Sequence, residues 1–331
     1  MAGTMTLAEH AKIETDVLRA SVIDDFRDNI KVMEILPAET TGKLGTVMTK
    51  WQALPTPVYK KLNEAFDSVD GTFKQKSETV SLMGFNIDTD KRLARAKNTI
   101  ADARAERQKM AMKAVGCVWN DKFINGSQVT DPDETNGLKY RVTNDPDVPA
   151  GNRISASAAA GGLDVMASAA NQHAFLDVLG KMMDALPGGV SDMANVLCFC
   201  NSTVLLALDS INRRLGLFPS TKWAFGGGMV RTYGDGGPAF IDMGYLVDDN
   251  TRVIPNSEVA TGGGAAQCTS IYAARLEEGY LWMHEEYPLE ATDMGLLESG
   301  VTYRTVVDWP HTLAQGHKRS IVRCYDLYFN V

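Results

Sequence analysis

The spacing of apolar side chains predicts a long helix preceded by a long two-stranded hairpin. From residue 90 to 122, apolar residues recur at three- and four-residue steps, which is the period of an α-helix. Over residues 47–52 two different sets of side chains alternate, as in a strand with two unlike faces, and a second strand-like run spans 71–87. An isolated two-stranded hairpin is at best marginally stable in water. The hairpin should therefore rest on another surface, and a neighbouring subunit is the natural candidate.

A further helix is predicted near the start of the chain, and its pattern does not specify the surface on which it packs. Apolar residues between 6 and 30 are spaced as in a moderately amphipathic helix, and Pro37 ends the segment. Its polar face is wide, so an arm that lies on another surface is as consistent with the pattern as a core helix. The polar start lacks the basic-then-apolar order of a secretory signal, which predicts no export by that route.

The second half of the chain alternates helices and strands. A one-sided apolar pattern predicts a helix over 172–186, and the apolar run 196–200 predicts a buried strand. Asn201 or Ser202 can cap the helix that follows, and Gly216 closes it. Alternation predicts strands over 301–309 and 321–329, and a strand at the end of a chain is normally held in a sheet with earlier strands. The predicted fold class is α+β.

Charge is distributed unevenly along the chain. The 331 residues contain 33 basic and 41 acidic side chains, a net charge of -8, which disfavours a broad basic surface for nucleic acid. Residues 91–122, however, hold nine basic and three acidic side chains and reach +6. These charges fit either a solvated helix face or a face that meets an anionic partner such as packaged nucleic acid. No run of apolar residues reaches the length of a membrane span.

No motif predicts catalysis, a cofactor or a metal. The triplets Gly226–Gly228 and Gly262–Gly264 lack the lysine of a phosphate-binding loop and are interpreted as turns. Asp131 and Asp133 begin like a calcium loop, but the required glycine and glutamate are absent, which favours a surface turn. His284 lacks the second histidine of a zinc helix. The five scattered cysteines fit a reducing compartment, and Cys198, Cys200 and Cys324 are interpreted as core side chains.

The order of these elements resembles the major capsid proteins of tailed double-stranded DNA bacteriophages, which share the Hong Kong 97-type fold. The residues that carry the resemblance are Phe123-Ile-Asn-Gly126, Asn136-Gly-Leu138, Leu176-Asp-Val-Leu179, Arg319-Ser-Ile-Val-Arg323 and Leu327-Tyr-Phe-Asn-Val331. Each motif is short, so the specificity lies in their order and spacing over nearly the whole chain. A shell subunit also needs extended surfaces that neighbours complete rather than a catalytic cleft.

The resemblance implies a division into four parts. These are an N-terminal arm (1–37), an extended loop (38–86), a peripheral domain with a spine helix at about 90–122 (87–165 and 310–331), and an axial domain (166–309). The extended loop would lie over an adjacent subunit, and the axial domain would gather around five-fold and six-fold axes. Because the arm begins close to Met1, a separate scaffolding protein is expected.

The resemblance also implies two sets of functional residues. The spine helix would face the shell interior and place four cations near DNA, with weak, nonspecific, salt-sensitive contacts: Arg92, Arg95, Arg104 and Lys113. The extended loop would contact the neighbouring subunit through Lys43, Trp51, Lys60, Lys61, Lys74 and Lys76. Further expected partners are a portal and decoration proteins, and the expected location is the virion after assembly in the host bacterial cytoplasm.

Two alternatives stand beside the phage capsid. An encapsulin-like compartment shares the fold but encloses a protein cargo, and a soluble cytosolic α/β enzyme would use the glycine-rich turns. Size separates the enzyme from the two containers, because an enzyme should sediment as a small oligomer and a shell protein as capsomers or shells.

Overall fold

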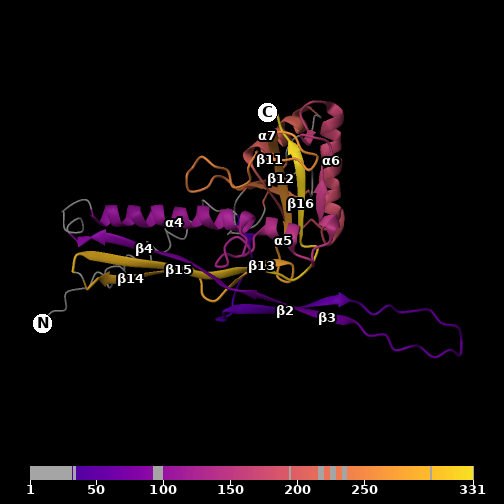
Figure 1. Cartoon of the computed structure of the whole chain (residues 1–331), viewed down its shortest axis with the longest axis horizontal. Helices are drawn as coiled ribbons and strands as arrows, with labels where there is room; N and C mark the ends of the chain where they lie inside the picture. Colours follow the sequence, from indigo (N-terminus) through magenta and orange to yellow (C-terminus); the bar gives the residue numbers. More distant parts are fainter. Residues whose placement is uncertain are drawn as a thin grey trace.

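The structure is a computed structural model that describes residues 32, 35–91, 100–193, 195–214, 220–223, 229–232, 237–298 and 300–330. Within these residues the chain forms an α+β arrangement of three β-sheets, two of which carry helices (Figure 1). The helix predicted within residues 6–30 lies outside the described residues. Val32 and Leu36, at the end of the predicted arm, are buried in the main core, and the Leu36 N–H donates to the Val32 carbonyl at 2.9 Å.

The first sheet runs beside the long helix α4 (Ile100–Asn125) in Figure 1. Its strands are β1 (Ala38–Thr40), β4 (Ser81–Asp90), β13 (Leu281–Glu285), β14 (Glu290–Leu296) and β15 (Thr302–Gln315). Strand β15 is central, because it pairs antiparallel with β4 on one side and with β13 and β14 on the other. Strand β1 adds to β13 in parallel. One long strand thus holds three others directly and holds β1 through β13.

Alternation along β4 explains how this sheet packs. Met83, Phe85 and Ile87 face the core, whereas the residues between them are exposed. From α4, Trp119 meets Trp309 of β15 with ring centroids 6.3 Å apart. The predicted helix therefore buries one side against the sheet. The described part of the helix begins at Ile100 and ends at Asn125, three residues beyond the predicted end.

The hairpin consists of β2 (Gly45–Ala53) and β3 (Thr72–Thr79), and it projects away from the rest of the chain in Figure 1. The prediction of one continuous second strand over 71–87 is wrong. Strand β3 pairs with β2, whereas β4 pairs with β15, and the two are separated at Val80, whose N–H donates to the Leu44 carbonyl at 3.1 Å. The chain changes partners there because it passes from the hairpin into the first sheet.

The second sheet stands beside the helices α6 (Ala169–Asp184) and α7 (Ser202–Arg214) in Figure 1. In spatial order its main strands are β5 (Arg153–Ser155), β16 (Ile321–Tyr328), β12 (Ala266–Arg275), β7 (Val196–Cys200), β10 (Ala239–Asp242), β9 (Met229–Thr232) and β8 (Ser220–Trp223). The short strands β6 (Leu163–Asp164) and β11 (Glu258–Val259) attach to β16 and β12. As predicted, β7 is wholly buried and the last strand is held by earlier ones.

Short helices complete the described chain, and the predicted N-cap of α7 is present, whereas Gly216, predicted to close that helix, lies outside the described residues. These helices are α5 (Leu138–Asn144), η1 (Ala150–Asn152) and η2 (Gly189–Ser191). The Asn201 side-chain oxygen accepts from the Val204 N–H at 3.2 Å, which confirms Asn201 as the cap of α7. No helix in the described ranges is both long and apolar enough to cross a bilayer.

Strand pairing links residues across the predicted segment boundaries, and those boundaries stay a prediction. Strands β13 and β14 fall within residues 166–309 yet pair in the sheet beside α4, whereas β16 falls within 310–331 yet pairs in the sheet with α6 and α7. The chain passes directly from one sheet to the other between β12 and β13, which are close in sequence but belong to different sheets.

The buried aromatic residues of α4 should dominate the stability of the described core. Phe123 is 1% exposed and meets Phe199 of β7 edge-on at 5.2 Å, so it joins the helix to the second sheet. We expect Phe123→Ala to lower the free energy of unfolding of the unassembled chain by about 3–5 kcal/mol in denaturant titrations. Phe66→Ala, at an exposed position of the hairpin, is the matched control and should change it by less than about 0.5 kcal/mol. Equal losses in the two variants would contradict this packing.

Candidate functional site

The outer part of the hairpin exposes many apolar side chains. Within the described residues, its exposed large apolar residues are Val47, Leu54, Val58, Tyr59, Leu62, Phe66, Val69 and Phe73. The side chains of Leu62 and Phe66 are 93% and 76% exposed. Soluble monomers rarely expose such clustered apolar surface unless a partner covers it. The hairpin is therefore the first candidate contact surface of the chain.

The two faces of the hairpin differ in chemistry. In the strand register, Lys50 lies opposite Lys74, and Met48 lies opposite Lys76. Because side chains alternate across a strand, these four residues share one face, together with Glu78. Glu78 and Met48 are buried against the body of the chain. This inner face joins the hairpin to the rest of the structure.

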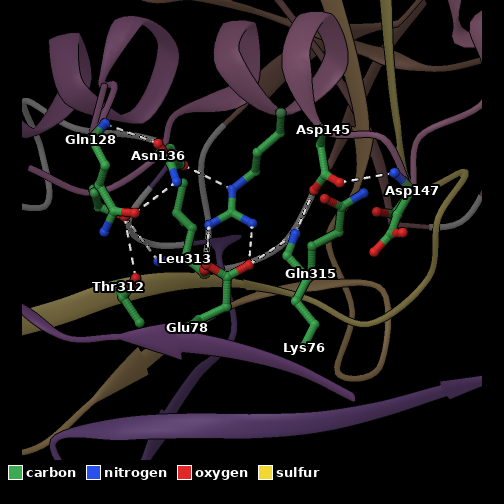
Figure 2. A network of polar contacts seen from close by, with 12 residues as sticks. Lys76, Glu78, Gln128, Asn136, Asp145, Asp147, Thr312, Leu313 and Gln315 are labelled. Atoms are coloured by element: carbon green, nitrogen blue, oxygen red, sulfur yellow. Dashed lines mark hydrogen bonds and ion pairs between the residues drawn. The ribbon is translucent and has the colours of Figure 1, made fainter. Parts of the chain in front are cut away.

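The central contact of the inner face is a buried ion pair between Glu78 of β3 and Arg141 of α5 (Figure 2). Arg141 is 1% exposed, and its two terminal nitrogens donate to the two carboxylate oxygens at 2.6 and 3.2 Å. The guanidinium also donates to the carbonyls of Asn136 at 2.8 Å and Leu313 at 2.7 Å. Burial raises the pKa of Glu78, but the charges of Arg141 and Lys76 outweigh it, so this pKa is lowered overall. A buried charge pair is stable only with such complete hydrogen bonding.

Two lysines of β3 meet two aspartates that follow α5. Lys76 binds Asp145 and lies 3.1 Å from Glu78, and Lys74 lies 2.5 Å from Asp147. Burial raises the pKa of Asp145, but hydrogen bonds from Lys76 and from the Asp147 N–H reverse the direction and lower it. The hydrogen bond to Asp147 raises the pKa of Lys74. The ion pairs thus favour the charged forms of Lys74 and Asp145. We call Lys74, Lys76, Glu78, Arg141, Asp145 and Asp147 the hairpin-base network.

The loop between α4 and α5 places Arg141 at this position. Gly137 donates its N–H to the Gly126 carbonyl at 2.9 Å, and a Cβ added at Gly126 would lie 2.4 Å from the Thr135 carbonyl oxygen. Only glycine permits this close return of the loop to the end of α4. Asn136 and Gln128 exchange hydrogen bonds of 2.9 Å across the loop. The two Asn-Gly motifs therefore serve to position the guanidinium.

An apolar contact supports the same joint. Met48 of β2 packs in a small cluster with Trp282 of β13 and Ala314 of β15. The Trp282 indole N–H donates to the Glu39 carboxylate at 3.1 Å, which links the cluster to β1. The end of the arm, the hairpin and the first sheet meet at this place.

The structure separates the predicted loop residues into two groups. Lys74 and Lys76 make their ion pairs within the chain, at the hairpin base. Lys61 is exposed in the outer part, and Lys60 binds Asp67 at 3.0 Å beside it. Lys43 is exposed just before β2, and Trp51 lies opposite Phe73 in the register.

The four predicted DNA-facing cations are described only in part. Arg92 and Arg95 lie outside the described residues. Arg104 lies in α4, and Lys113 is exposed on the same helix, as is Arg107, which donates to the Asp88 carbonyl at 3.2 Å.

The residues that the sequence analysis interpreted as core or turn residues lie in the core and in turns of the described chain. Cys198, Cys200 and Cys324 are fully buried, and burial raises the pKa of each thiol, so they are core side chains as predicted. Asp131 accepts from the Asp133 N–H at 3.1 Å, as in a surface turn. Across the described ranges, no group of three or more His, Cys, Asp or Glu side chains could hold a metal ion.

Sequence reasoning missed the buried members of the network. Glu78, Arg141 and Asp145 were not among the predicted site residues. One signal was available, because Glu78 follows Lys74 and Lys76 on the same face of a strand. The partners Arg141 and Asp145 lie more than sixty residues away, and no local pattern connects them to β3.

The arrangement of a projecting hairpin, a long helix beside one sheet and a second sheet with its own helices is that of the Hong Kong 97-like capsid fold. Among solved structures, the chain is similar to the SrpI encapsulin of Synechococcus elongatus PCC 7942, with a TM-score of 0.59, 15% identity and coverage of 90% of this chain and 87% of that chain. It is similar to the capsid of the native GTA particle, with a TM-score of 0.59, 12% identity and 89% coverage of each chain. For the Mycobacterium phage Cain structure, the TM-score is 0.55, the identity 11%, and the coverage 91% of this chain and 90% of that chain.

The sequence itself matches one family. The family model of the major capsid protein GP7 matches residues 27–168, which include the hairpin, α4, and α5 with Arg141. No protein of curated function matches the chain by sequence. The identities to solved structures are low, so those likenesses concern the fold. Both comparisons point the same way: the family model of a major capsid protein matches part of the chain, and the fold over nearly the whole chain is that of capsid-shell proteins. Neither comparison favours the enzyme alternative.

Removing one charge of the buried pair should destabilise the chain strongly. We expect Glu78→Gln to lower the free energy of unfolding by about 3 kcal/mol at pH 7, because it leaves the Arg141 guanidinium buried without its counter-charge. Glu64→Gln, in the exposed outer part of the hairpin, is the matched control and should have little effect.

Acid should narrow the difference in the free energy of unfolding between the wild type and Glu78→Gln. Because the pKa of Glu78 lies below its ordinary value of 4.5, the carboxylate stabilises the folded chain above that pH, and this contribution is lost as the pH falls further. Denaturant titrations from pH 7 to 3 measure it. A gap that persisted unchanged at pH 3 would speak against an ion pair.

Proposed function

We propose that this protein forms the pentameric and hexameric capsomers of an icosahedral shell around a double-stranded DNA genome. The observation that carries the proposal is the hairpin, whose outer part extends from the body with its apolar side chains uncovered (Figure 1). Residues that gain burial only in an assembly stabilise the assembled state over the separate subunit. A second copy of this chain is the partner that every subunit of a shell meets.

The hairpin divides into an anchored and a contacting part in this proposal. The network of β3 with α5 fixes the direction in which the hairpin leaves its own subunit. The outer residues, including Lys61 and Phe66, then lie on the neighbour. In this view Lys43, Trp51, Lys60 and Lys61 belong to the contact between subunits, whereas Lys74 and Lys76 set the hairpin direction from within the chain.

We propose that the two sheets form the cores of the two domains that the resemblance implies. The sheet beside α4 is proposed as the peripheral domain, and the sheet with α6 and α7 as the axial domain, which gathers at the five-fold and six-fold axes. The proposed boundaries follow strand pairing, so that β13–β15 belong with α4 and β16 with the axial sheet.

The spine helix is proposed to face the packaged DNA. Lys113 and Arg107 are exposed on α4, and the residues 91–122 carry a net charge of +6 in a chain of net charge -8. Exposed cations on an otherwise acidic protein attract phosphates without sequence preference, and salt weakens the attraction. A separate scaffolding protein, a portal and decoration proteins are the further proposed partners, with assembly in the host bacterial cytoplasm.

An encapsulin-like compartment is the second candidate function. Its support is the likeness to the SrpI encapsulin, which is as strong as that to the GTA capsid. Nucleic acid content separates the two functions, because a compartment of this kind encloses protein. Electron microscopy and absorbance spectra of shells purified from infected or producing cells decide between them.

Shortening the hairpin should prevent assembly without unfolding the subunit. Deleting residues 55–70 and replacing Leu54→Asn joins the new asparagine directly to Gly71. The resulting Asn-Gly turn connects Ala53 and Thr72, which already face each other in the register. We expect the melting temperature of the subunit to stay within a few degrees, because the removed residues are nearly all exposed. Negative-stain images, with and without a candidate scaffold, should show no shells. Normal shells, or an unfolded subunit, would overturn this role of the hairpin.

Removing the cations of the spine helix should reduce packaging more than shell formation. We expect the combined change Arg92→Gln, Arg95→Gln, Arg104→Gln and Lys113→Gln to leave shells intact and to lower the DNA content per shell. The matched control removes the same charge from exposed positions elsewhere: Lys181→Gln, Arg213→Gln, Arg214→Gln and Lys318→Gln. Equal DNA content in the two variants would remove the DNA-facing role of α4.

A further inference from the structure

The inner face of the hairpin carries an unfavourable pair of like charges. Lys50 of β2 lies directly opposite Lys74 of β3, and Lys76 is the next lysine on the same face. Like charges that face each other across strands destabilise a hairpin. Strand pairing alone therefore does not explain why the hairpin base keeps three lysines together.

The three lysines differ in whether an acidic side chain pairs with them. Lys74 and Lys76 have Asp147 and Asp145 as partners. The Lys50 nitrogen is buried and, among the described residues, has no hydrogen-bond partner. An ammonium group that is buried without a hydrogen bond is unfavourable, because water no longer solvates it. Lys50 is thus the one lysine of this face left without an acceptor in the described structure.

The surrounding charges do not neutralise Lys50. The groups that act on it electrostatically are Lys76, Asp145, Asp147 and Arg141, and it in turn acts on His317 between β15 and β16. With Lys74 and Glu78 included, four cations face three carboxylates. Burial, followed by the charge of Lys76, lowers the pKa of Lys50 to about 8. Burial also lowers the pKa of His317, so at neutral pH this imidazole adds no further positive charge.

We propose that Lys50 is a destabilising charge that keeps the hairpin in a metastable position on its own subunit, so that it turns away when a second copy of this chain offers a better surface. The inference rests on the proposed function of the hairpin in assembly. The hairpin-base network holds the hairpin in place, and the buried Lys50 ammonium opposes it. When the base opens, the ammonium regains water, and the cost of its burial is recovered.

Hydrogen exchange of the unassembled full-length chain tests the proposal directly. We expect Lys50→Met, which keeps the length of the side chain and removes the charge, to slow exchange of the β2 and β3 amides at the base by about tenfold or more. Lys181→Met, at an exposed position of α6, is the matched control and should leave these rates unchanged. Equal or faster exchange in Lys50→Met than in the wild type would overturn the proposal.

A pH series on the wild-type chain provides a second test that needs no variant. A lysine whose pKa is about 8 when buried and about 10.5 when free loses its burial penalty as the pH rises between these values. After correction for intrinsic exchange, protection of the base should rise by about tenfold or more from pH 7 to 9.5. Lys50→Met should lack this rise. A flat profile in the wild type would contradict the proposal.

These measurements are independent of shell formation. A chain that forms normal shells can still show no effect of Lys50→Met on exchange, which would refute the metastable base and leave the capsid function intact. Conversely, a chain that forms no shells under any condition would refute the assembly function, whatever the exchange of its hairpin.

Discussion

The buried ion pair of Glu78 with Arg141 is the interaction on which the arrangement of the chain depends. It joins a hairpin that has almost no core of its own to a helix that is fixed by the end of α4, and through the Leu313 carbonyl it reaches the central strand β15. The guanidinium of Arg141 thus connects three elements that are distant in sequence: β3, α5 and β15. Charge pairs of this kind add little net stability compared with apolar packing, but they demand one geometry. That property suits a joint that must hold an extended element in a defined direction.

The apolar and polar contacts at the joint have different roles. Met48, Trp282 and Ala314 supply burial, which is tolerant of small displacements. The pairs of Lys74 with Asp147 and Lys76 with Asp145 supply direction, and they lie closer to water, where salt weakens them. The hairpin is consequently held firmly next to β15 and progressively less firmly toward its outer end, whose apolar residues are left for a partner.

Periodicity was sufficient to predict the elements that bury one regular face. The helix around Val115 and Phe123, the buried strand Val196–Cys200 and the last strand all follow from spacing, because each packs a repeating set of side chains against one surface. The change of partners at Val80 could not be predicted, since both sides of it continue the same alternation. The grouping of strands into sheets depends on pairings across two hundred residues, which no local pattern contains. For the same reason the sequence revealed the lysines of the hairpin but not Arg141 or Asp145.

Strand β15 has one more mechanical consequence. Its fourteen residues extend for roughly 48 Å at about 3.4 Å each, and β4 accompanies ten of them without a break in register. A pair of strands bonded along such a length bends little, so it behaves as a beam. Gln315 at one end lies near the hairpin base, and Thr302 lies at the other end, beyond the reach of any direct contact. A displacement imposed on β15 near Gln315 would therefore move the Thr302 end with it as one rigid body, rather than being absorbed along the strand.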